Sequence, residues 1–64
     1  MKWVDVNDIA IELADNHPEI DPLTISFPAL MKLVSSLPEF DDEDGRCGEK
    51  ILEAIQMAWI EERD

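Results

Sequence analysis

The sequence predicts a small, mainly helical protein with a winged-helix-like arrangement. Three segments with apolar residues at helical spacing, two of them followed by proline, predict three helices. A short alternating segment between the first two helices predicts a strand. A chain of 64 residues is sufficient for one domain, so residues 1–64 are expected to form a single unit.

The first predicted helix begins after Asp5, whose side chain is suited to the N-cap position. The apolar residues that recur at helical spacing along it are Ile9, Ala10, Leu13 and Ala14. Pro18 cannot continue a helix, so we expect this one to end near Asn16 or His17.

An extended segment is predicted next. Pro18 and Pro22 lie four residues apart and exclude regular helix between them. Residues 24–27 alternate and are rich in strand-forming side chains, which predicts a short strand. Trp3 and Val4 are its expected partner, so the two segments would form a two-stranded extended pairing.

Two further helices follow. Proline is tolerated in the first turn of a helix, so the second helix is expected to begin around Pro28 and to end before Pro38. Its apolar residues are Leu30, Met31, Leu33, Val34 and Leu37. The third helix is expected from Glu49, with an apolar stripe made of Ile51, Leu52, Ile55, Ala58 and Trp59. Glu49 and Arg63 complement the two ends of its dipole.

These elements are expected to enclose one apolar core. Its predicted members are Trp3, Ile9, Leu13, Ile25, Phe27, Leu30, Val34, Leu37, Leu52, Ile55 and Trp59. A chain this short buries only about 60% of the surface of its unfolded state, so its stability is expected to be marginal.

The charge balance restricts the classes of partner that this protein is expected to bind. Sixteen acidic residues and five Lys or Arg residues give a net charge of −11. Binding to nucleic acid or to anionic membranes is therefore disfavoured, whereas a cation or a basic protein surface is favoured. One cysteine excludes an internal disulfide, and the start of the chain turns acidic at Asp5 rather than forming a signal peptide. We expect a reduced, cytoplasmic protein.

Negative charge is concentrated in residues 39–44, here called the acidic loop. Its members are Glu39, Phe40, Asp41, Asp42, Glu43 and Asp44, and five of the six carry a carboxylate. Like charges repel and do not build a core, so the loop is expected to serve a cation, a basic partner or solubility. Phe40 is interpreted either as an anchor beneath the loop or as an exposed aromatic at a docking surface.

The acidic loop does not match a calcium-binding EF-hand. With Gly45 at the sixth position of that motif, Phe40 and Ile51 fall at the first and twelfth positions, where carboxylates are required. What remains is a loose set of hard oxygen ligands for a divalent cation, consisting of Asp41, Asp42, Glu43 and Asp44. Weak, solvent-exposed metal binding is the expected behaviour.

The sequence contains few other candidates for chemistry. Cys47 is the only cysteine and cannot hold an iron–sulfur cluster by itself. His17 is the only histidine, and its position at a helix end explains it without a catalytic role. Since no nucleophile and base are paired, we expect a protein that is not an enzyme.

Several short motifs together resemble the IscX family over nearly the whole chain. They are Lys2-Trp3, residues 18–22, Phe27, residues 37–42, residues 49–56 and Ala58-Trp59. Members of that family are small acidic accessory proteins of bacterial iron–sulfur cluster assembly. The chain departs from the family pattern at Asp44, where a proline is usual, and at Cys47-Gly48, where Ser-Asn is common.

The resemblance implies a winged-helix-like fold and binding to the cysteine desulfurase of the assembly system. It also implies weak binding of ferrous iron (Fe²⁺), no tightly bound cofactor, and a site that overlaps that of the bacterial frataxin homologue. Asp41, Asp42 and Glu43 belong to the loop implicated in these contacts, and Glu61 and Glu62 are expected contributors.

We therefore predict a monomeric adaptor that regulates the desulfurase. The expected partner-binding residues are those of the acidic loop, residues 39–44, with Glu61 and Glu62. The alternative is a metallochaperone that delivers ferrous iron to the cluster scaffold.

Overall fold

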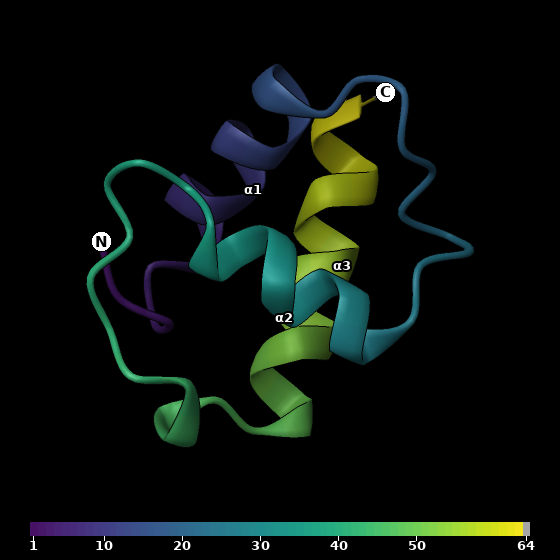
Figure 1. Cartoon of the computed structure of the whole chain (residues 1–64). Coiled ribbons are helices and arrows are strands. Elements are labelled where there is room, and N and C mark those ends of the chain that lie inside the picture. The colour runs from purple at the N-terminus through teal and green to yellow at the C-terminus, as the bar shows by residue number, and fades with distance from the viewer. Residues whose placement is uncertain (64) are drawn as a thin grey trace.

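In the described part of the chain, three α-helices joined by two long connections make up the fold (Figure 1). The computed structural model describes residues 1–63, except for the side chain of Asp44. The helices are α1 (Val6–Asn16), α2 (Phe27–Ser35) and α3 (Glu49–Arg63), and a short 3-10 helix, η1 (Asp44–Arg46), precedes α3. The three predicted helices are confirmed. No helix within residues 1–63 combines the length and the apolar character needed to cross a membrane.

The N-terminal ends of α1 and α2 depend on different local hydrogen bonds. Asp5 occupies the N-cap position of α1, but its side chain accepts a hydrogen bond from the Lys2 backbone N–H at 2.8 Å instead of capping the helix. The predicted side-chain cap is therefore wrong, although the helix begins where expected. At α2, the Ser26 hydroxyl accepts a hydrogen bond from the Ala29 N–H at 3.3 Å, and Pro28 lies in the first turn.

The third helix is the centre of the packing. It lies mainly against α1, and α2 crosses both helices (Figure 1). The connection from α1 to α2 runs along α3, where the Gln56 amide donates to the Pro22 carbonyl oxygen at 2.7 Å. Arg63 pairs with Asp21 at 3.4 Å and holds the same connection near the end of α3.

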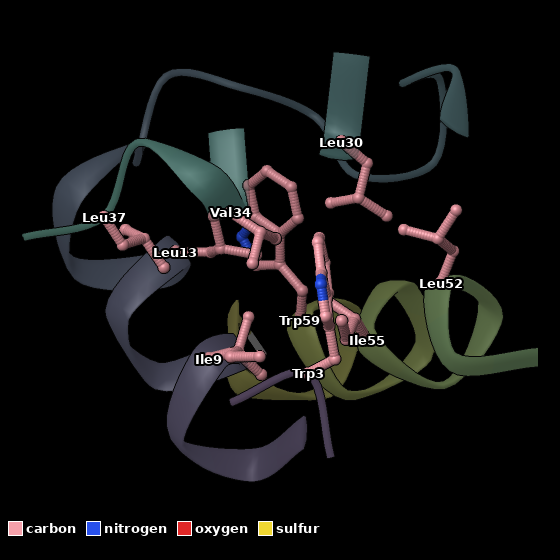
Figure 2. Packing of buried hydrophobic residues seen from close by; sticks show 10 residues of the cluster. Trp3, Ile9, Leu13, Leu30, Val34, Leu37, Leu52, Ile55 and Trp59 are labelled. Atoms are coloured by element: carbon pink, nitrogen blue, oxygen red, sulfur yellow. The ribbon is translucent and has the colours of Figure 1, made fainter. Parts of the chain in front are cut away.

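The core lies where the three helices meet (Figure 2). Its buried residues are Trp3, Ile9, Ala10, Leu13, Leu30, Val34, Leu37, Leu52, Ile55 and Trp59. Of the predicted core residues, Ile25 and Phe27 are partly exposed, and the rest are buried. The helical spacing therefore identified the inward faces correctly.

The predicted strand at residues 24–27 is wrong. The Asp21 carboxylate accepts a hydrogen bond from the Leu23 N–H at 2.9 Å, and the Thr24 N–H donates to the Asp21 carbonyl oxygen at 3.2 Å. These bonds form a turn that leads directly to Ser26 at the start of α2. The described residues contain no strand, so the two-stranded pairing and the winged-helix-like arrangement are not supported.

The two tryptophans have contrasting polar environments. The Trp3 indole N–H donates to the Glu43 carbonyl oxygen at 2.8 Å. Among the described residues, the Trp59 indole nitrogen is buried without a hydrogen-bond partner. An unpaired buried donor costs about 1–3 kcal/mol, whereas a made hydrogen bond contributes about 0.5–1.5 kcal/mol. Both rings therefore stabilise the fold through apolar burial. The indole N–H adds to stability at Trp3 and reduces it at Trp59.

This difference is testable by replacing each tryptophan with 3-benzothienylalanine, which keeps the ring shape and substitutes sulfur for the N–H. At position 3 we expect the free energy of unfolding to fall by about 0.5–1.5 kcal/mol, because a hydrogen bond is lost. At position 59 we expect the free energy of unfolding to stay the same or to rise, because the N–H that is removed has no partner. Urea denaturation of the two synthetic chains measures both values, and a larger loss at position 59 than at position 3 would contradict the assignment.

Candidate functional site

The acidic loop lies against the N-terminal segment of the chain (Figure 1). The Asp41 N–H donates to the Met1 carbonyl oxygen at 3.0 Å, and the Met1 ammonium donates to the Glu39 carbonyl oxygen. The Phe40 N–H donates to the Leu37 carbonyl oxygen at 3.1 Å, which turns the chain after α2. The loop is therefore attached to the folded domain through its backbone.

Phe40 anchors the loop to the core. Its ring packs edge-on against the ring of Trp3, with centroids 4.7 Å apart and planes at 70°. An aromatic pair in this geometry contributes about 0.5–1.5 kcal/mol beyond the burial of its area. Phe40 is partly buried and contacts the core cluster, which favours the interpretation as an anchor over that as an exposed docking aromatic.

Asp42 is the inward-facing carboxylate of the loop. Its side chain is only 10% exposed, and it accepts hydrogen bonds from the backbone N–H groups of Trp3, at 3.1 Å, and Glu43, at 2.8 Å. The bond from Trp3 does most to lower the pKa of Asp42; burial opposes it, and Glu43, Arg46 and Lys2 lower the pKa further. This charge holds the loop and residue 3 together.

Asp41 faces solvent and is paired with two cations. The Lys2 ammonium lies 3.3 Å from its carboxylate and donates to its backbone carbonyl oxygen at 2.8 Å. The Met1 ammonium lies 3.4 Å from the same carboxylate. Hydrogen bonding from Lys2, followed by that from the Met1 ammonium, lowers the pKa of Asp41. The side chain is 69% exposed, so these pairs add little to stability.

The remaining predicted site residues occupy two separate places. Glu39 and Glu43 are exposed on the loop, and Glu43 lies 3.7 Å from the Arg46 side chain. The side chain of Asp44 lies outside the described part of the structure. Glu61 and Glu62 are exposed near the far end of α3, about 18 Å along the helix from its start (Figure 1). The structure therefore does not join them to the acidic loop in one patch.

Metal ligands are not gathered in advance in the described residues. Within that part of the chain, no three His, Cys, Asp or Glu side chains converge on a position that would hold an ion. The Asp42 carboxylate is already bonded to backbone N–H groups, and the Asp41 carboxylate is paired with Lys2. Iron binding by the acidic loop stays a prediction.

Cys47 and His17 lie in structural surroundings. Cys47 is partly buried and packs against the core cluster after η1. His17 follows α1, where its backbone N–H donates to the Leu13 carbonyl oxygen, and its ring lies 3.8 Å from the Glu19 carboxylate. Both positions are explained by packing and helix termination.

The sequence interpretation missed the role of residues 1–3 in the site. Lys2 supplies a cation to Asp41, and Trp3 supplies two N–H donors to the loop. One signal was present, because a buried tryptophan needs a partner for its indole N–H. The sequence alone did not indicate that this partner would be the backbone at Glu43.

Comparison with known proteins identifies the family. The chain matches the family model described as iron–sulphur cluster assembly over residues 1–64. The chain belongs to this family. It is also 56% identical, over 64 residues, to an uncharacterised protein of Pseudomonas aeruginosa, covering 100% of this chain and 97% of that protein. Membership in this family indicates that the protein takes part in iron–sulphur cluster assembly.

The bonds of Asp42 predict a pH-dependent contribution to stability. Its pKa in the folded protein lies below the ordinary 3.8, so its contribution is complete above about pH 4 to 5 and is lost as the pH falls through the folded-state value. We expect Asp42→Asn to be less stable than the natural chain at pH 7, and the gap to close toward about pH 2. Urea denaturation across this range measures it.

Asp15→Asn is the matched control, because it removes one carboxylate from an exposed position on α1. If the stability gap for Asp42→Asn were no larger than that for Asp15→Asn, or did not change with pH, the structural role of Asp42 would be refuted.

Proposed function

We propose that this protein is an IscX-like adaptor that binds the cysteine desulfurase through the exposed carboxylates of the acidic loop and regulates sulfur transfer. The observation that carries the proposal is that the loop is attached to the domain while Asp41 and Glu43 remain 69% and 82% exposed. A basic surface would meet charges that already have a defined position. We place this activity in the cytoplasm.

The ordered backbone of the acidic loop favours tight binding of a partner to a small surface. The backbone bonds to Met1 and the packing of Phe40 on Trp3 hold the loop before a partner arrives. A preorganised segment loses less conformational entropy on binding than a flexible one. With a net charge of −11, the chain also attracts a basic partner at a distance, which raises the association rate.

Ferrous iron fits this proposal as a signal. Asp41, Glu43 and Glu39 present carboxylate oxygens to solvent, and such hard ligands suit the ion. With few ligands in place, the affinity would be on the order of micromolar or weaker. A bound ion would neutralise part of the docking surface and change its fit with the desulfurase.

The adaptor is better supported than the iron metallochaperone. A carrier needs several carboxylates that converge on one ion, whereas within the described residues no three do so and Asp42 is bonded inward. The two functions differ in one measurement. A metallochaperone would deliver its iron to new clusters faster than the same concentration of free iron, and an adaptor would not.

Charge reversal at exposed loop residues tests the docking surface. For the double variant Glu39→Lys with Glu43→Lys, we expect affinity for the purified desulfurase to fall on the order of tenfold or more, because opposite charges become like charges. The affinity of the natural chain should also weaken steeply as salt rises. Isothermal titration at low and high salt measures both effects, and Asp42 is left intact because it supports the fold.

The matched control is Asp15→Lys with Glu53→Lys, which changes the net charge equally at exposed positions of α1 and α3. If both double variants lost affinity to the same extent, overall charge rather than the acidic loop would explain binding. If neither lost affinity, the proposed surface would be wrong.

A further inference from the structure

The acidic loop carries its own cations. Two of the five Lys and Arg residues in the sequence contact it, Lys2 at Asp41 and Arg46 at Glu43 and Asp42. The Met1 ammonium adds a third positive group at Asp41. Among the described side chains of the loop, the carboxylates of Asp41, Asp42 and Glu43 are therefore paired with three cations from the same chain.

The backbone that carries Lys2 and Arg46 is fixed by hydrogen bonds. Lys2 lies between Met1, whose carbonyl oxygen accepts from the Asp41 N–H, and Trp3, whose two N–H groups donate to Asp42 and Glu43. Arg46 lies in η1, where its N–H donates to the Glu43 carbonyl oxygen at 3.1 Å. Each side chain therefore begins close to its carboxylate.

The charged ends of Lys2 and Arg46 nevertheless remain movable. Their side chains are 54% and 71% exposed, and ion pairs at such exposure contribute little to stability. Either side chain is able to swing into solvent without disturbing the buried core. The paired carboxylates are thus occupied by groups that a competing cation displaces at small cost.

We propose that Lys2 and Arg46 are built-in competitors that occupy the acidic loop until a basic partner surface displaces them. The inference rests on the proposed docking function of the same loop. It adds an autoinhibitory contact, in which the affinity of the loop for a cationic surface is set partly by residues outside it. Removing a competitor takes one cation away from its carboxylate and strengthens docking.

Single neutral substitutions test the competition. We expect Lys2→Gln and Arg46→Gln each to raise the affinity for the purified desulfurase about two- to fivefold, the size expected when one exposed ion pair no longer competes. Lys32→Gln is the control, because Lys32 is exposed on α2 and its loss changes the net charge by the same amount. At about 0.15 M salt, its effect through space should be screened.

The NMR resonance of the Trp3 indole N–H shows whether the acidic loop stays attached to the domain in each variant, because that group donates to the Glu43 carbonyl oxygen. Tighter binding by Lys2→Gln and Arg46→Gln, but not by Lys32→Gln, supports the proposal. Equal changes in all three variants, or none, overturn it while leaving the docking function intact. Failure of the natural chain to bind the desulfurase overturns the docking function and this inference with it.

Discussion

The burial of Trp3 beside the acidic loop is the contact that organises this protein. Its ring closes the core and packs against Phe40, while its two N–H groups bond to Asp42 and to the backbone at Glu43. A large aromatic ring contributes strongly through area alone, and its polar atoms also need partners once they are buried. The same short loop meets both requirements, so Trp3 connects the core directly to the candidate site.

This contact divides the negative charges of the loop into two groups. Asp42 is turned inward and satisfies backbone N–H groups, so its charge belongs to the fold. Asp41 and Glu43 are turned outward and pair with Lys2 and Arg46, whose side chains are largely exposed. A run of similar residues in the sequence therefore contains members with different physical roles, because alternate side chains meet the core and the solvent.

The chain belongs to an iron–sulphur cluster assembly family, and its proposed role depends on a surface. In that proposed role, the outward carboxylates would attract a basic partner, and the fixed backbone beneath them would reduce the loss of entropy on docking. The same exposure would limit how tightly a metal ion is held there, because few ligands surround one point. Partner binding and weak ion binding are therefore expected to compete for the same groups.

Much of the fold was predictable because its determinants are local. Pro18 and Pro38 end the first two helices, and apolar spacing identifies the faces that form the core. The strand at residues 24–27 was mispredicted because strand propensity there was overridden by hydrogen bonds to Asp21 and by the Ser26 cap. The separation of Glu61 and Glu62 from the acidic loop also became visible only once the length and direction of α3 were known.

The sequence by itself determined the three helices, their inward faces and the position of the acidic loop, because periodicity, proline and charge act between near neighbours. Only the tertiary structure decided which carboxylates are available. The bonds that turn Asp42 inward and pair Asp41 with Lys2 join residues 39 positions apart. Such pairings arise when the core closes around Trp3, and no local pattern in the chain encodes them.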